Sequence, residues 1–170
     1  MPIIASTAVG ALPDGLELPP MTDEMAAVFA EESPDPDWGD REAVLDWAVD
    51  AFRPFAGSGP FEEAELRAVA GQLLDRLPRP EVLASGNNHF QVDPGPGPKR
   101  TLGELDVPAL VIHGAEDPLF PLPHGEALAR LIPGAELLVL DGTGHELPRR
   151  SWDRVIPAVV ALTVRAEGGA

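Results

Sequence analysis

The chain contains no cysteine and no tyrosine, and none of its apolar runs approaches the roughly 20 residues of a membrane helix. Without cysteine, a disulfide framework and a thiolate nucleophile are both excluded. No basic-then-apolar start suggests a secretory signal. Basic residues are also scarce: 12 Lys and Arg face 28 Asp and Glu, a net charge of −16, which argues against nucleic-acid or anionic-membrane partners. We therefore expect a soluble protein of the reducing cytoplasm.

Three apolar stretches predict β-strands in a chain of 170 residues that is 44% hydrophobic and long enough for one ordinary domain. The first stretch is Met1–Val9, which we expect to be a buried strand of about residues 2–7. The others, Pro108–His113 and Glu136–Leu140, are unbroken apolar runs typical of strands buried on both faces of a parallel sheet.

Helical periodicity fills much of the sequence between the first two predicted strands. Thr22 and Asp40 are expected helix N-caps, the first helix running to about Glu32. A third helix is predicted over Glu62–Leu77, with apolar residues on one face. Ser85–Pro98 is rich in glycine, proline and asparagine and is predicted to be an irregular loop.

Strands and helices alternate in the last third of the chain. Leu122–Ile132 is predicted to be an amphipathic helix, and Ser151 is expected to cap a final helix that Pro157 kinks or restarts. Strand, helix, strand and helix in this order form a βαβα unit, which requires a parallel sheet with a right-handed crossover.

Two polar loops follow the second and third predicted strands. The first loop, HGAEDPLFP, carries Asp117, and the second, DGTGHELP, carries His145. Neighbouring parallel strands lie about 4.8 Å apart, so these two side chains can meet at the carboxyl edge of the sheet. A carboxylate that fixes one imidazole nitrogen leaves the other nitrogen free to act as a base. Glu116 is the alternative acid, and no histidine spacing predicts a metal site.

Residues Val107–Pro148 resemble the final third of α/β-hydrolases, with a G-x-x-D-P loop, L-x-x-x-I-P-G-A and a G-x-G-H loop. Within that superfamily the chain is most similar to the aclacinomycin methylesterase-like esterases. The resemblance implies an α/β fold class with three parallel strands, flanking helices and an inserted α-helical cap. Its domains would be a first core strand at 1–10, cap and linker at 11–100, and a core segment at 101–170, with the family's remaining strands preceding Met1.

The resemblance also implies a catalytic pair without its nucleophile. Asp117 matches the triad acid and His145 the general base of a carboxylic-ester hydrolase that acts on small-molecule esters without a cofactor. None of the five serines has the G-x-S-x-G frame that the family's nucleophile occupies. The family's oxyanion hole would also precede Met1. We therefore expect a fragment that is inactive alone, with the acid and base as a remnant of the triad.

Two other functions stay open: a non-catalytic ligand-binding or interaction domain, and a compact hydrolase with an unframed nucleophile such as Ser6 or Thr7. The first strand would have an unpaired edge, so self-association or poor stability is also expected. The remaining candidates are interpreted as structural, solvated or core residues. The alternative for His113 and His124 is contact with substrate, and the alternative for Trp38, Trp47, Phe52 and Phe55 is the lining of an apolar pocket. The loop residues Asn87, Asn88 and His89 are interpreted as structural or solvated.

Overall fold

The computed structural model describes residues 1–8, 12–13, 15–31, 33–91 and 101–168. Its three strands are β1 (Pro2–Ile4), β2 (Leu110–Gly114) and β3 (Glu136–Leu140). They form one parallel sheet in the order β1-β2-β3, in which Ile3 pairs with Val111 and Val111 with Leu137. The predicted parallel three-stranded sheet is confirmed, and it places the two polar loops side by side.

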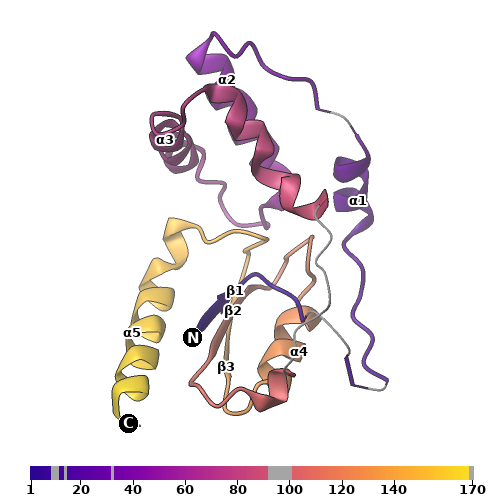
Figure 1. The fold of residues 1–170 in the computed structure, drawn as a ribbon, viewed down its shortest axis with the longest axis vertical. Helices are drawn as coiled ribbons and strands as arrows, with labels where there is room; N and C mark the ends of the chain where they lie inside the picture. Colours follow the sequence, from indigo (N-terminus) through magenta and orange to yellow (C-terminus); the bar gives the residue numbers. More distant parts are fainter. Residues whose placement is uncertain (9–11, 14, 32, 92–100, 169–170) are drawn as a thin grey trace.

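Two helices cover opposite faces of this sheet (Figure 1). They are α4 (Pro123–Leu131), which connects β2 with β3, and α5 (Trp152–Gly168) at the end of the chain. The core beneath α5 consists of Leu110, Ile112, Leu140, Val155 and Leu162. All five residues of β2 are buried, as an unbroken apolar run at the centre of a parallel sheet requires. Strand β2 and helix α4 are therefore confirmed as predicted. Strand β3 has the predicted bounds, but the prediction that it is buried on both faces is wrong: Glu136 is exposed and only Leu140 is buried, because β3 is the other outer strand of the described sheet.

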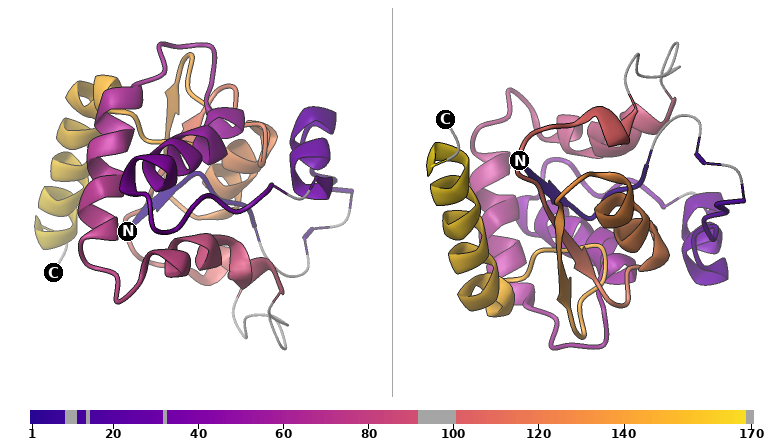
Figure 2. Two further views of the ribbon diagram at one scale, coloured as in Figure 1. Left: turned by 90° about the horizontal axis from the view of Figure 1, so that it is seen from above. Right: turned by 90° about the horizontal axis from the view of Figure 1, so that it is seen from below.

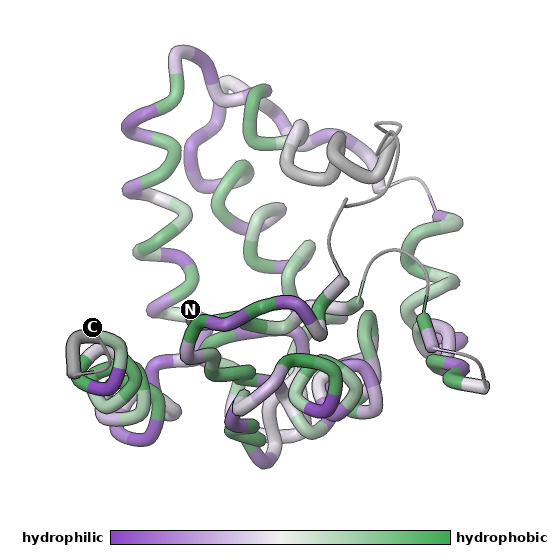
Figure 3. Tube along the Cα trace, turned by 60° about the horizontal axis from the view of Figure 1, so that its bottom comes forward, coloured by the Kyte–Doolittle hydropathy of each residue, from purple (hydrophilic) through white to green (hydrophobic). Residues whose placement is uncertain are grey.

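The other helices lie beyond one end of the sheet, and the views from above and below show α5 at one margin of the molecule and α1 at the other (Figure 2). They are α1 (Asp23–Ala30), α2 (Arg41–Phe52), the short 3-10 helix η1 (Arg53–Phe55) and α3 (Glu63–Leu74). Hydrophilic and hydrophobic stretches alternate along them (Figure 3), as expected of helices with one buried face.

Side-chain caps fix where two of these helices begin. The hydroxyl oxygen of Thr22 accepts a hydrogen bond from the Met25 N–H at 3.2 Å, and a carboxylate oxygen of Asp40 accepts from the Glu42 N–H at 2.9 Å. Each satisfies a main-chain donor that the first helical turn leaves free. Both predicted N-caps are confirmed.

No helix in the described part of the chain is long and apolar enough to cross a membrane.

The prediction for the first strand is wrong in its length and burial. β1 ends at Ile4 because Ala5, with φ of 42°, turns the chain in the left-handed region. Pro2 and Ile4 are exposed, since β1 is an edge strand whose only partner among the described residues is β2. Burial of a strand depends on its neighbours, so an apolar run alone could not establish it.

Two predictions for the segment between the first and second strands also need correction. The third helix ends at Leu74, three residues early, with Val69 and Leu73 exposed. Part of the predicted loop at Ser85–Pro98 belongs to a 3-10 helix, η2 (Pro80–Gln91), and residues 92–98 lie outside the described part.

At the end of the chain, a further 3-10 helix, η4 (Arg149–Ser151), precedes α5. Ser151 does not cap α5, because its hydroxyl donates to the carbonyl oxygen of Pro148 at 2.7 Å. Helix α5 begins at Trp152 and continues through Pro157, so the proline does not restart it. The predicted cap at Ser151 is therefore wrong, and of the two alternatives at Pro157 the restart is excluded.

Candidate active site

Asp117 lies in the loop after β2 and is held by three hydrogen bonds. Its Oδ1 accepts from the main-chain N–H groups of Leu119 and Phe120, at 2.9 and 2.8 Å. Its Oδ2 lies 2.8 Å from Nδ1 of His145, and the Asp117 side chain is fully buried. A buried carboxylate is costly unless its oxygens are satisfied, and here both oxygens have partners. The loop therefore presents one carboxylate oxygen to an imidazole.

His145 lies in the loop after β3, on the neighbouring strand. An ionised carboxylate can only accept, so the hydrogen bond to Asp117 assigns the ring proton to Nδ1 and leaves Nε2 as the basic nitrogen. The side chain is about one quarter exposed. The rings of Phe55 and Phe120 lie near the imidazole, with centroids 6.1 and 5.5 Å away. The imidazole is therefore partly accessible, and a buried carboxylate orients its ring.

The loop glycines let the two loops approach closely. A β-carbon on Gly114 would collide with the carbonyl oxygens of Thr143 and Gly144, and a β-carbon on Gly144 would collide with the carbonyl oxygen of Phe55. Gly142 has φ of 61°, a conformation that glycine adopts without strain. Close main-chain packing and the backbone conformation therefore explain why glycines occupy positions 142 and 144, just before His145.

His113 is buried in β2 and contacts the loop that follows this strand and carries Asp117, residues 115–121, which we call the acid loop. Its Nε2 lies 2.7 Å from the carbonyl oxygen of Phe120, which can only accept, so the ring proton is on Nε2. The same nitrogen is 3.6 Å from Oδ2 of Asp117, beyond hydrogen-bond range, and the buried Nδ1 has no hydrogen-bond partner among the described residues. The sequence-based interpretation of His113 as a packed residue at the strand end agrees with these contacts.

His124, in the first turn of α4, contacts two residues of the segment between β1 and α1. Its Nε2 donates to the carbonyl oxygen of Pro19 at 2.8 Å, so its Nδ1 accepts from the Thr7 hydroxyl at 2.6 Å. The Phe120 ring lies 5.5 Å from the ring centroids of both His124 and His145. Nothing in the spacing of the sequence signals this pairing of Thr7 with His124.

Glu116, the alternative acid, does not contact His145. Its carboxylate accepts from the main-chain N–H of Ser58 at 2.6 Å and from the Ser58 hydroxyl at 2.8 Å. These two bonds lower the pKa of Glu116 below its ordinary value, the main-chain bond most strongly. The structure thus favours Asp117 over Glu116 as the partner of the imidazole.

The other sequence candidates are dispersed. Trp38 and Trp47 pack edge to face against each other, with ring centroids 5.6 Å apart, whereas Phe52 is exposed and Phe55 lies beside His145. The side chains of Asn87, Asn88 and His89 lie outside the described part. Among the described residues, no group of three or more His, Asp or Glu side chains is placed to hold a metal ion.

Residues 10–148 match the family model described as the alpha/beta hydrolase fold. The chain belongs to the α/β-hydrolase family. It is also similar to curated members: it is 30% identical to the rhodomycin D methylesterase of Streptomyces sp. (strain C5) over 135 residues, and 30% identical to that of Streptomyces peucetius over 132 residues. These matches cover 74% and 72% of this chain but 42% and 41% of the relatives, so the chain spans less than half the length of the relatives it matches.

Solved structures agree on the fold. The meta-cleavage product hydrolase from Pseudomonas fluorescens IP01 superposes with a TM-score of 0.61 at 20% identity, covering 98% of this chain and 56% of that one. The 2-hydroxy-6-oxo-6-phenylhexa-2,4-dienoate hydrolase from Rhodococcus sp. strain RHA1 gives a TM-score of 0.52 at 20% identity, covering 95% and 54%. Sequence likeness to the methylesterases and structural likeness to these hydrolases together confirm the predicted family and fold class.

Proposed function

We propose that Asp117 and His145 are the triad acid and the general base of a carboxylic-ester hydrolase. The observation that carries this proposal is the 2.8 Å contact between Asp117 Oδ2 and His145 Nδ1 at the carboxyl edge of a parallel sheet. In such a reaction, Nε2 of His145 accepts the proton of the attacking hydroxyl and later returns it to the leaving alcohol. Asp117 holds the ring in the required tautomer and stabilises its cationic form.

The substrate class follows from the surroundings of the base and from the relatives. Two phenylalanine rings, Phe55 and Phe120, lie beside the imidazole and suit a substrate with an apolar or aromatic acid portion. Two similar proteins are methylesterases that act on rhodomycin D. We assign a small-molecule carboxylic ester of this general kind as the substrate, with no cofactor, in the cytoplasm, and residues 11–100 as the cap over the site.

The nucleophile is absent from the sequence in the form that this chemistry requires. No serine has glycine at both the second preceding and the second following position, and no cysteine is present. The proposal therefore includes that residues 1–170 form part of an esterase and do not turn over esters alone. A serine on a sharp strand-to-helix turn, together with its oxyanion hole, has to come from polypeptide outside these residues.

A completed enzyme tests the proposal. The residues of the Streptomyces sp. (strain C5) methylesterase that precede its matching part are fused ahead of Met1. Hydrolysis of p-nitrophenyl acetate by this fusion is then followed. We expect turnover by the folded fusion and none above background by residues 1–170. Substitution of Asp117 by Ala should remove the turnover of the fusion, and turnover that survives this change would reject the assignment.

One observation favours a second candidate, a compact hydrolase that uses Thr7. The contact of the Thr7 hydroxyl with Nδ1 of His124, whose Nε2 donates to Pro19, has the order of nucleophile, base and orienting group. This candidate predicts that residues 1–170 alone hydrolyse p-nitrophenyl acetate and lose that activity in Thr7→Ala. A non-catalytic ligand-binding domain instead predicts ligand binding that survives His145→Ala.

Self-association belongs to the same proposal. The outer edge of β1 has no partner among the described residues, and Met1 and Ile4 beside it are exposed. Helix α5 adds an exposed apolar stripe that recurs every fourth residue, formed by Trp152, Ile156, Val160 and Val164. An open strand edge next to apolar surface favours pairing with a second chain. We propose that residues 1–170 associate through this edge when no other polypeptide covers it.

A further inference from the structure

The segment that connects η1 to α3 lies against the loop that carries His145. We call residues Phe55–Glu62 the return segment and residues Asp141–Pro148 the base loop. The main-chain N–H of His145 donates to the carbonyl oxygen of Phe55 at 2.7 Å, and the N–H of Gly59 donates to the carbonyl oxygen of Gly142 at 2.9 Å. The two segments are thus joined by main-chain hydrogen bonds, one of them at the proposed base itself.

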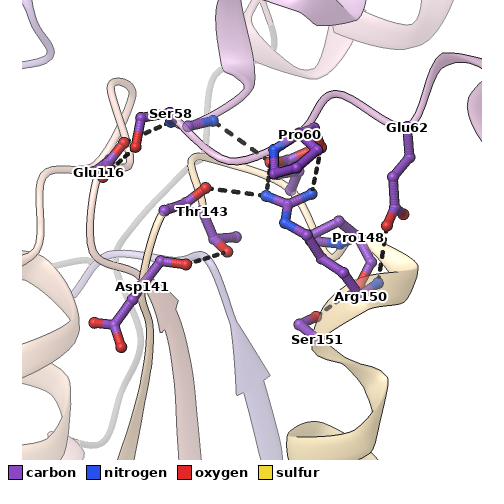
Figure 4. A network of polar contacts seen from close by, with 12 residues as sticks. Ser58, Pro60, Glu62, Glu116, Asp141, Thr143, Pro148, Arg150 and Ser151 are labelled. Carbon is purple, nitrogen blue, oxygen red and sulfur yellow. Dashed lines mark hydrogen bonds and ion pairs between the residues drawn. The ribbon is translucent and has the colours of Figure 1, made fainter.

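Arg150, in the 3-10 helix η4 directly before α5, connects these two segments (Figure 4). Its Nη1 donates to the carbonyl oxygen of Pro60 at 3.0 Å. Its Nη2 donates to the carbonyl oxygen of Gly142 and to the carboxylate of Glu146, each at 3.0 Å. One planar guanidinium therefore donates hydrogen bonds to the return segment and to both ends of the turn that contains His145. A lysine ammonium cannot reproduce this set of hydrogen bonds.

Two carboxylates hold the ends of the return segment. Glu62 accepts from the main-chain N–H groups of Arg149 and Arg150, at 2.7 and 3.0 Å. At the other end, Ser58 donates its N–H and its hydroxyl to Glu116 in the acid loop. Figure 4 shows these contacts on both sides of the Arg150 guanidinium. The return segment is therefore attached to the acid loop, the base loop and the start of the last helix.

The packing leaves little space for the base loop to shift toward the return segment. A β-carbon on Gly57 would lie 2.7 Å from the carbonyl carbon and oxygen of Gly142, and one on Gly59 would lie 2.6 Å from that oxygen. His145 is consequently fixed at two points, its ring by Asp117 and its main chain by Phe55. The main-chain contact of His145 with Phe55 depends on how firmly the return segment is held.

We propose that Arg150 is a positioning residue for His145, which couples the position of the helices beyond the sheet to the geometry of the acid–base pair. The inference rests on the proposed function, because the position of His145 matters for catalysis only if His145 is the general base. Without the guanidinium, the carboxylate of Glu146 loses its ion-pair partner and the carbonyl oxygens of Pro60 and Gly142 lose a shared donor. The base loop then separates more easily from the return segment, and the ring of His145 loses its fixed relation to Asp117.

The experiment measures the ring of His145 in residues 1–170, without any need for turnover. Exchange of its Nδ1 proton with water is followed by NMR in the wild type, Arg150→Ala, Arg150→Lys and Arg149→Ala. Arg149 is a matched control, because it is the neighbouring arginine and its guanidinium pairs with Glu65 of α3 at 3.2 Å. Among the described residues, this guanidinium has no hydrogen bond to the base loop or the return segment. The main-chain amide of Val111, at the centre of the sheet, reports global opening.

We expect exchange at His145 to accelerate roughly tenfold or more in Arg150→Ala and to change less than about twofold in Arg149→Ala, with Val111 unaffected in both. Arg150→Lys should give a partial effect, and it provides the test if Arg150→Ala does not fold. Equal exchange in the Arg150 variants and the wild type overturns the inference, as does acceleration that only parallels Val111. Because no ester is involved, this result is independent of whether the completed enzyme hydrolyses esters.

Discussion

The main-chain N–H of His145 donates to the carbonyl oxygen of Phe55, 2.7 Å away, and the residue before it, Gly144, has no room for a side chain at the same contact. A β-carbon on Gly144 would also lie 2.7 Å from the carbonyl carbon of Ala56 and the nitrogen of Gly57. All three neighbours are main-chain atoms, which cannot rotate away.

Gly144→Ala should therefore destabilise the fold by about 1–3 kcal/mol, the usual cost of overpacking, and displace the base loop. Urea unfolding measures the change. Gly103→Ala is the control, since the nearest atoms to a β-carbon there lie 3.9 Å away, and it should alter stability by less than about 0.5 kcal/mol. Equal stability of the two variants would contradict the packing described at Gly144.

Asp117→Asn should reverse the tautomer of His145 while preserving the loop. The amide oxygen can still accept from the N–H groups of Leu119 and Phe120, whereas the amide nitrogen then faces Nδ1 and can only donate. The proton of the neutral ring therefore moves to Nε2. Nitrogen NMR of the imidazole distinguishes the two tautomers, and a ring that stays protonated on Nδ1 would show that Asp117 does not control it.

The contact between Glu116 and Ser58 should weaken in acid. Because hydrogen bonds from Ser58 lower the folded-state pKa of Glu116 beneath its ordinary value of 4.5, the carboxylate stabilises the fold above that value. This contribution is lost as the pH falls through the lower folded-state pKa. The wild type should therefore be more stable than Glu116→Gln at pH 7, and the difference should disappear at strongly acidic pH. A difference that does not change with pH would exclude this linkage.

The open edge of β1 predicts association of residues 1–170. Light scattering after size-exclusion chromatography should show dimers or larger species, or a chain of low stability. Ile4→Lys places a charge beside the edge and should shift the distribution toward monomer. Val69→Lys, at an exposed apolar position on α3 away from the sheet, is the control and should have no such effect. A stable, folded wild-type monomer would count against association through this edge.

Much of the sheet and of the acid–base pair could be predicted from the sequence, because both depend on local signals. Unbroken apolar runs identify β2 and β3, and residues directly after neighbouring parallel strands must share an edge, so Asp117 and His145 could be paired in advance. The family resemblance led to the same two residues.

The contacts of Arg150, Phe55 and Thr7 could not be found in this way. Each joins segments far apart in the chain through main-chain groups or a single side chain, and such pairings have no residue pattern of their own. The length and burial of β1 were missed for a related reason, since they depend on the turn at Ala5 and on the absence of a second neighbouring strand among the described residues.

Two imidazoles lie near Phe120, and comparing them in the completed enzyme tests the central assignment most directly. kcat/KM for p-nitrophenyl acetate is measured for His145→Ala and His124→Ala in the same fusion. If His145 is the general base, its loss should lower kcat/KM by about a thousandfold or more, whereas loss of His124 should cost less than about tenfold. Equal losses, or a larger loss for His124, would contradict the proposed assignment of Asp117 and His145 as the acid and base.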